Sequence, residues 1–380
     1  MVDTRHDCRE AGARGSAAAS LPDPFRRSDG SRIAAAADWP GRRSEILEQI
    51  VGLEYGGLPP RPERTEWVEL SRSAVRWIDG ASFITGQVRT GPDHPFGFMM
   101  QLLVPPGEGP FEVVLNGDGC WRTVTDEVSR DVIRRGRILA QFNRTEIVAD
   151  NDGWRDTGLC RLFPEGTFGA LAAWAWGYHR CVDALATLPE VDAARIAVVG
   201  HSRGGKTTLL AGATDERIAL TAANNSGAGG AGCFRVQGPK SETLADLLRN
   251  FARWFGPAMP DYVGREADLP FDQHFLKALV APRALLTTEG FGDVWANPVG
   301  TWQTHLAARE VYRFLDAPER IGIRYREGGH DHGLADWKTL LDYMDVQFGG
   351  QPVQACFSPD PFPGVPPAFR WRAPGVPPAP

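Results

Sequence analysis

Residues 196–213, with the sequence IAVVGHSRGGKTTLLAGA, satisfy two unrelated motifs with the same atoms. Read as G-x-x-x-x-G-K-[ST], the stretch from Gly200 to Thr207 predicts a loop that cradles phosphate groups. Read as G-x-S-x-G, it places Ser202 between Gly200 and Gly204 and predicts a nucleophile elbow, a sharp turn that exposes a serine hydroxyl. Both motifs need a strand before and a helix after, so the rest of the chain must decide between them.

Apolar runs alternate with helical patterns along most of the chain. Several of these runs are apolar throughout, as expected of strands that are buried on both faces. The alternation predicts an α/β fold with a mostly parallel sheet, helices on both faces and antiparallel strands at its N-terminal edge. The expected strands are SFITGQVRT (82–90) and FGFMMQLLVP (96–105) at that edge, then FEVVLN (111–116), RILAQFN (137–143), RIAVVG (195–200), IALTAAN (218–224), RALLTTE (283–289) and IGIRYRE (321–327).

The order of residues after Ser202 favours the elbow of an α/β-hydrolase. Such a fold needs an acid and then a histidine, each in a loop that follows a strand. Asp293 follows the strand 283–289, and His330 follows the strand 321–327. A serine hydroxyl is a weak nucleophile at neutral pH, so an imidazole must take its proton and a carboxylate must orient that imidazole. Oxyanion donors are expected from the backbone N–H of Arg203 and from the loop NGDGCW (116–121).

Composition narrows the class of protein and of partner. A net charge of −6 and a pI near 5.8 argue against a nucleic-acid partner. No run of 18 or more apolar residues is present, so no membrane-spanning helix is expected. The six cysteines are widely spaced, and His330 and His332 have no third ligand near them in sequence, so we expect no metal and no cofactor.

We expect three parts in the chain: a flexible N-terminal arm (1–25), a catalytic domain (26–350) and a proline-rich tail (351–380) that is either solvated or strapped over the surface. The first segment carries charges where a signal peptide has its apolar part. This favours a cytoplasmic location, or secretion if the start site is misassigned. The oligomeric state stays open.

Five further stretches carry a family resemblance. Together with the elbow, the sequence from about residue 21 to 348 resembles the glucuronoyl esterases, carbohydrate esterase family fifteen, in particular their bacterial branch. The matching stretches are GHSRGGK (200–206), NSGAGG (225–230), WFGP (254–257), LPFDQHFLKALVAPR (269–283), GDVWANP (292–298) and REGGHDHGLADW (326–337).

The resemblance implies an α/β-hydrolase that cleaves, without a metal, the ester between 4-O-methyl-glucuronate on xylan and lignin alcohols. It implies that Ser202 is the nucleophile, that the Arg203 side chain stabilises the oxyanion and that Lys206 binds sugar hydroxyls. Trp295 is a possible wall of the sugar pocket.

The sequence departs from the fungal pattern at one position. Fungal members have a glutamate as the triad acid where this chain has Asn225. We therefore expect Asp293 to supply the acid, with Glu289 as the alternative, and His330 to be the base, with His332 as the alternative.

Three other functions stay open at this point. The first is a carboxylesterase for other sugar esters, such as acetyl esters. The second is a nucleotide-binding protein that uses Lys206 and Thr207. The third is a carbohydrate binder without catalysis, in which Asn225 marks a lost acid.

Overall fold

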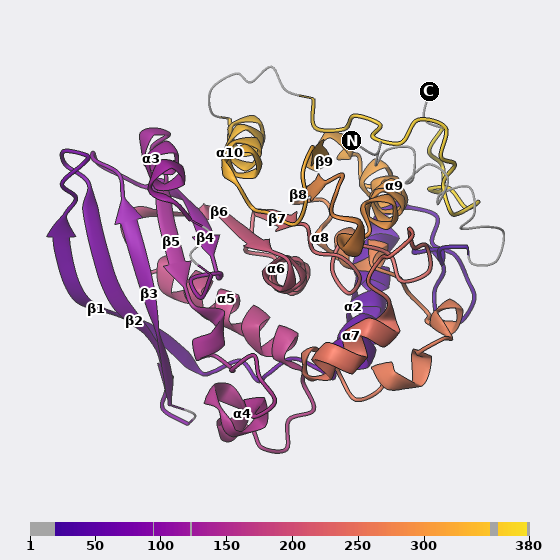
Figure 1. Cartoon of the computed structure of the whole chain (residues 1–380), viewed down its shortest axis with the longest axis horizontal. Coiled ribbons are helices and arrows are strands. Elements are labelled where there is room, and N and C mark those ends of the chain that lie inside the picture. Colours follow the sequence, from indigo (N-terminus) through magenta and orange to yellow (C-terminus); the bar gives the residue numbers. More distant parts are fainter. Residues whose placement is uncertain (1–19, 94, 122–123, 350–355, 378–380) are drawn as a thin grey trace.

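The computed structural model describes residues 20–93, 95–121, 124–349 and 356–377 (Figure 1). Nine strands form one sheet in the order β1-β2-β3-β5-β4-β6-β7-β8-β9, which is antiparallel from β1 to β5 by way of β3 and parallel from β5 to β9. The strands are β1 (Arg64–Ala74), β2 (Ser82–Gly91), β3 (Phe96–Val104), β4 (Phe111–Asn116), β5 (Ile138–Phe142), β6 (Val191–His201), β7 (Leu220–Asn224), β8 (Ala284–Gly290) and β9 (Ile321–Arg326).

Helices cover both faces of the parallel strands, as the alternating pattern predicts. In Figure 1, α3 and α10 lie above the sheet, and α5 and α6 lie below it. The α-helices are α2 (Trp39–Tyr55), α3 (Asp126–Arg134), α4 (Gly158–Leu162), α5 (Ala170–Leu185), α6 (Arg203–Thr214), α7 (Leu244–Phe251), α8 (His274–Val280), α9 (Pro298–Phe314) and α10 (Leu334–Phe348).

The central strands divide their side chains between two apolar layers. On β4, Val113 packs in the layer of α5 and α6, whereas its neighbour Val114 packs in the layer of α3 and α10. Ile196 and Ala197 on β6 divide in the same way. Because successive side chains of a strand point to opposite faces, strands that are buried on both sides must be apolar throughout.

One edge strand was not predicted from the sequence. β1 carries polar side chains on both faces, and most of its residues are half-buried or exposed. It lies at the end of the sheet and pairs only with β2 among the described strands. An edge strand with little buried surface lacks the apolar alternation that identifies a strand in a sequence.

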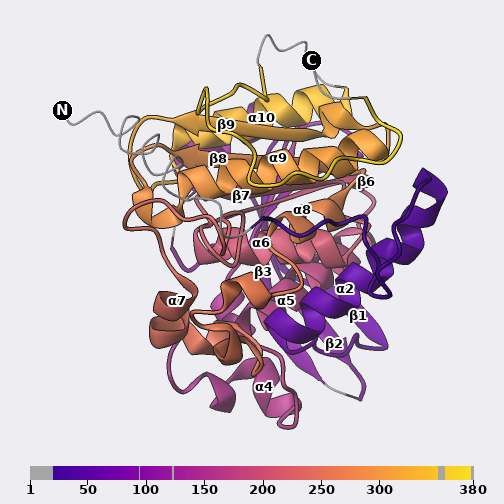
Figure 2. The same ribbon diagram turned by 90° about the vertical axis from the view of Figure 1, so that its right-hand side faces the viewer.

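Both ends of the described chain pack on the body of the protein. Leu21 and Phe25 are buried, so the packed chain begins before residue 26, where the flexible arm was expected to end; residues 1–19 lie outside the described part. The segment 356–377 is an extended strap that runs across α9 (Figure 2). Gln303 of α9 fastens this strap, donating to the Pro366 carbonyl and accepting from Ala368 N–H.

The described helices include none that is both long and apolar enough to cross a membrane.

The strap contributes to stability through Phe362, which is 1% exposed and packs against Phe291 and Tyr325. We expect Phe362→Ala to lower the free energy of unfolding by about 3 kcal/mol, because it opens a cavity in this cluster. Urea unfolding measures the change. Phe83→Ala, at a side chain that is 37% exposed, is the matched control and should cost much less. A loss below about 1 kcal/mol for Phe362→Ala would show that this side chain does not fasten the strap to the fold.

Candidate active site

Ser202 lies alone between a strand and a helix. β6 ends at His201 and α6 begins at Arg203. The backbone of Ser202 has φ 56° and ψ −124°, a conformation that non-glycine residues rarely adopt and that is typical of strained functional turns. A phosphate-binding loop needs several residues between strand and helix, but here the stretch from Gly204 to Lys206 is already helical. The local geometry is therefore that of the nucleophile elbow.

The elbow needs glycine because its backbone packs against other chain segments. A Cβ atom on Gly200 would lie 2.4 Å from the Gly204 carbonyl oxygen, and one on Gly204 would lie 2.0 Å from an Asp118 carboxylate oxygen. Asp118 also accepts a hydrogen bond from His201 N–H at 2.7 Å and forms a buried ion pair with Arg144. The turn is thus fastened to the loop that follows β4.

Asp293 and His330 meet next to this turn. His330 Nδ1 lies 2.6 Å from Asp293 Oδ2, and the His330 ring lies 4.5 Å from the ring of His201, the residue before Ser202. Burial raises the pKa of Asp293, but the hydrogen bonds from His330 and Asn225 outweigh it and bring the pKa below its ordinary value. Asp293 is therefore an ionised acceptor that orients the imidazole, as a triad requires.

The alternative acid and the alternative base occupy other environments. Glu289, near the end of β8, is fully buried, and burial followed by the charge of Asp293 raises its pKa well above the ordinary value. His332 is 6% exposed and stacks on Trp337, and burial lowers its pKa. The side chain of His330, by contrast, is 43% exposed. The structure thus places Asp293 and His330 in contact, whereas Glu289 and His332 are buried in other surroundings.

His201 was not considered in the sequence analysis. Its Nδ1 lies 2.6 Å from Asn224 Oδ1, and its ring lies between those of His330 and His332. Burial, and then the nearby His330, lower the pKa of His201 to about 4. A neutral His201 can pack on His330 without opposing the positive charge that His330 gains as a base.

Arg203 is held by an acid from a distant loop. Its Nη1 donates to Asp150 Oδ2 at 2.6 Å, and Trp254 Nε1 donates to Asp150 Oδ1 at 2.9 Å. The guanidinium also lies over the Trp254 ring, 4.8 Å from its centroid, and 5.4 Å from that of Trp121. These contacts hold the cation beside Ser202 in one orientation, because both its charge and its flat face are engaged.

The loop 116–121 differs from the expectation that it supplies backbone oxyanion donors. Gly117 N–H donates to the Tyr178 hydroxyl, and Asp118 N–H donates to Asn116 Oδ1. Gly119 and Trp121 donate to the carbonyls of Phe142 and Asp118. These four N–H groups are engaged within the protein and hold the loop in shape.

Lys206 is buried, and three acceptors surround its ammonium group. Its Nζ donates to the carbonyls of Ser226 and Ala228 and to Glu242 Oε2, at 2.7, 2.5 and 2.9 Å. These contacts use all three donors of the ammonium group. Glu242, which the sequence analysis did not identify, is also joined through its N–H to the carbonyl of Trp295. Trp295 is 45% exposed and so presents an aromatic surface beside this buried ion pair.

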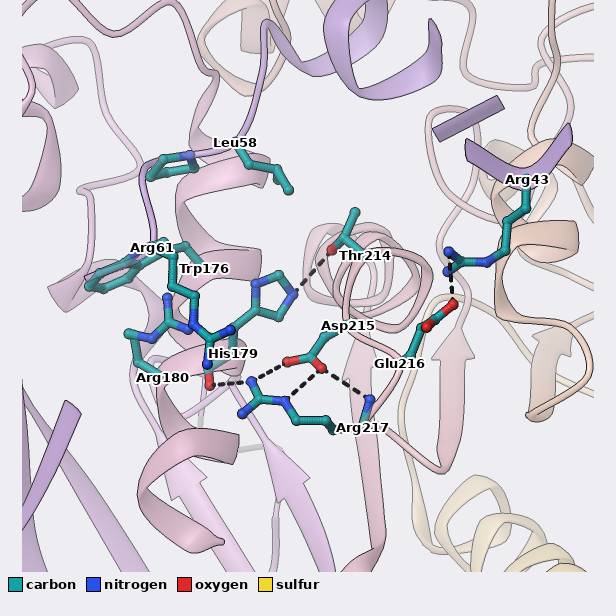
Figure 3. A pocket seen from close by; sticks show the side chains of 11 residues that line it. Arg43, Leu58, Arg61, Trp176, His179, Arg180, Thr214, Asp215, Glu216 and Arg217 are labelled. Carbon is teal, nitrogen blue, oxygen red and sulfur yellow. Dashed lines mark hydrogen bonds and ion pairs between the residues drawn. The ribbon is translucent and has the colours of Figure 1, made fainter. Parts of the chain in front are cut away.

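A cavity of about 480 Å³ lies at the other end of α6 (Figure 3). Thr214, Asp215 and Arg217, at and beyond the end of the helix, line it together with Arg43. The 12 residues of α6 separate it from Ser202 by about 18 Å, at a rise of about 1.5 Å per residue. Arg43 pairs with Glu216, and Arg217 pairs with Asp215. This cavity contains neither Ser202 nor His330.

Comparisons with known proteins agree with this geometry. A family model described as "Glucuronyl esterase, fungi" matches residues 92–316. The 4-O-methyl-glucuronoyl methylesterase 1 of Wolfiporia cocos is 32% identical over 82% of this chain and 76% of its own length. The corresponding enzyme of Schizophyllum commune is also 32% identical, over 90% of this chain and 84% of its own length.

Solved structures give the same result. The family 15 glucuronoyl esterase of Caldicellulosiruptor kristjansonii superposes with a TM-score of 0.80 and 31% identity, over 93% of this chain and 97% of its own. A variant of the Sporotrichum thermophile enzyme, in complex with methyl 4-O-methyl-beta-D-glucopyranuronate, superposes with a TM-score of 0.73 and 27% identity, over 90% of this chain and 89% of its own. The chain therefore belongs to the glucuronoyl esterase family, carbohydrate esterase family 15, and has the α/β-hydrolase fold.

Proposed function

We propose that this protein hydrolyses esters of 4-O-methyl-glucuronate, with Ser202 as nucleophile, His330 as general base and Asp293 as the triad acid. The observation that carries the proposal is the 2.6 Å contact between Asp293 Oδ2 and His330 Nδ1 beside the strained turn at Ser202. Names of relatives that state this substrate support it.

The contact with Asp293 distinguishes the two ring nitrogens of His330. Because Nδ1 donates to the Asp293 carboxylate, Nε2 is the basic nitrogen that takes the proton of the Ser202 hydroxyl. Ser202 Oγ then attacks the ester carbonyl and forms a tetrahedral oxyanion. Nε2 returns the proton to the leaving alcohol as the acyl-enzyme forms, and a water molecule activated by the same nitrogen releases the uronic acid.

Arg203 is the proposed oxyanion donor. As the first residue of α6, it has a backbone N–H with no partner inside the helix, and its guanidinium lies 5.4 Å from the centroid of the Trp121 ring, which also contacts His201, the residue before Ser202. A cation fixed in advance stabilises the negative charge of the tetrahedral intermediate without rearranging at the moment of reaction.

Glu242, Lys206 and Trp295 form the proposed sugar side of the site. Lys206 holds Glu242 Oε2, which leaves Oε1 to accept a hydrogen bond from a ring hydroxyl. The exposed ring of Trp295 offers an apolar face for the pyranose. Lys206 in this arrangement acts on the sugar mainly through Glu242. The uronate ester bound to the Sporotrichum thermophile relative supports a ligand of this kind.

Substitutions in the triad test the assignment. We expect Ser202→Ala and His330→Ala to lower kcat by about 10⁴-fold or more, and Asp293→Asn to lower it by about 10³-fold because the wrong tautomer forms. His332→Gln and Glu289→Gln should reduce kcat by less than about tenfold, since both groups lie off the reaction path. Steady-state hydrolysis of benzyl glucuronate measures each effect. A loss for His332→Gln as large as for His330→Ala would exchange the two histidines.

Substitutions of Arg203 and of its ion-pair partner Asp150 test the proposed oxyanion donor. Arg203→Lys should lower kcat by about 10²-fold with little change in KM, because an ammonium cannot contact Asp150 and the oxyanion in the same geometry. Asp150→Asn, which keeps the shape but loses the charge, should lower kcat by about tenfold. Arg249→Lys, at an exposed ion pair with Asp246 on α7, is the control and should match the wild type. An unchanged kcat for Arg203→Lys would remove the guanidinium from the mechanism.

The substrate class is tested by comparing two esters. We expect a higher kcat/KM for benzyl glucuronate than for an acetyl ester, and we expect Trp295→Ala to lower the former about tenfold through KM while leaving the latter unchanged. A preference for the acetyl ester would support the alternative of another sugar ester. Hydrolysis of neither ester, together with carbohydrate binding, would support a binder without catalysis.

A further inference from the structure

We propose that Asn225 is a positioning residue, whose amide holds the Asp293 carboxylate toward His330 and keeps a second negative charge out of the acid's surroundings. This inference rests on the proposed function, because it assigns Asn225 a role through the triad acid. It also gives the position a function in this chain, where the fungal pattern has a glutamate.

The amide of Asn225 contacts the same oxygen as the histidine. Asn225 Nδ2 donates to Asp293 Oδ2 at 2.6 Å, and His330 Nδ1 lies 2.6 Å from that oxygen. Asn225 is 1% exposed, and its N–H donates to the Thr288 carbonyl at the end of β8. Its φ of 44° lies in the left-handed region, which asparagine tolerates better than most residues. Its backbone N–H is thus anchored to β8, while its side-chain Nδ2 is engaged by Asp293.

The carboxyl groups nearby explain why an amide suits this position. Asp293 is 4% exposed, and Glu289 is fully buried close enough for the charge of Asp293 to raise its pKa. A carboxylate at position 225 would put a second acid in contact with Asp293 Oδ2, in surroundings that already hold the buried Glu289. Two carboxyl groups in such contact cannot both be ionised, so one would hold a proton or turn away. An amide instead donates at every pH and carries no charge.

The other ionisable groups around Asp293 and Glu289 come from five elements. His330 and Asp331 lie in the loop after β9, His201 ends β6, Glu289 belongs to β8, Lys277 of α8 faces Glu289, and Asp336 of α10 also acts on Glu289. Among the described residues, only His330 shares Oδ2 with Asn225, and no hydrogen bond joins Glu289, Lys277 or His201 to Asp293. Loss of the amide therefore leaves the Asp293 carboxylate with one donor fewer on that oxygen.

Two substitutions test whether Asn225 positions the Asp293 carboxylate or only fills space. Asn225→Gly fits the positive φ but removes the donor, and we expect kcat to fall about tenfold or more at every pH while KM changes little. Asn225→Asp keeps the shape and provides a donor only while the new carboxyl is protonated. Burial and the neighbouring acids raise the pKa of that carboxyl. The variant should therefore work within about threefold of the wild type at low pH and lose about tenfold or more as the pH rises through that pKa.

The measurement is the pH dependence of kcat and KM from pH 5 to 9 for both variants, with benzyl glucuronate and with an acetyl ester. The rate at which a fluorophosphonate labels Ser202 gives a readout that does not depend on the ester substrate. If benzyl glucuronate is not preferred, the substrate proposal fails, but the ratio of variant to wild type on the acetyl ester and in labelling still tests Asn225.

Thermal melting checks that each variant folds, and Gln101→Glu, an exposed amide-to-acid change on β3, is the control with an unchanged profile. An alkaline loss of activity for Asn225→Asp, absent from Gln101→Glu, supports the proposal. It is overturned if Asn225→Gly retains the wild-type kcat and labelling rate. It is also overturned if the defect of folded Asn225→Asp is the same at every pH, because a purely structural defect would not titrate.

Discussion

The backbone reversal at Ser202 is the constraint on which the site depends. A buried strand becomes a buried helix within a single residue, and that residue takes the strained conformation with φ 56°. The turn is possible only because Gly200 and Gly204 let the strand, the helix and Asp118 approach more closely than any side chain would allow. The surrounding packing stabilises the strain, and in return the serine hydroxyl stands clear of the sheet at the N-terminus of α6.

The parallel sheet brings the other groups to this turn. β6, β7, β8 and β9 are neighbours in that order, and the residues at or just beyond their ends are His201, Asn225, Asp293 and His330. Adjacent strands lie about 4.8 Å apart, so residues that are far apart in the chain meet at one edge. Asp293 can take the place of an acid from the β7 end because the β7 and β8 ends are adjacent, and Asn225 at the end of β7 then donates to it.

Buried carboxylates from distant loops support the reacting groups. Asp118 fastens the turn through His201 N–H and Arg144, and Asp150 fastens the guanidinium of Arg203. Glu242 likewise forms a buried ion pair with Lys206. In each case an acid that is largely removed from water is matched by a cation, and Asp118 and Asp150 also accept from His201 N–H and Trp254 Nε1, an arrangement that makes a buried charge tolerable. The cations near Ser202 are thus held in place rather than free at the surface.

The sequence by itself determined the α/β class, the central strands, the elbow and the ordered acid and histidine. Those features depend on local patterns: apolar runs, glycine spacing and chain order. It did not identify β1, because that edge strand is polar on both faces, and it left open the choice between Asp293 and Glu289 and between His330 and His332. Only the tertiary structure distinguishes the members of each pair, since burial and contact with distant strands separate residues that look equivalent in sequence. The partners Asp150, Glu242 and Asn225 have no local signature, because their roles arise from contacts across the fold.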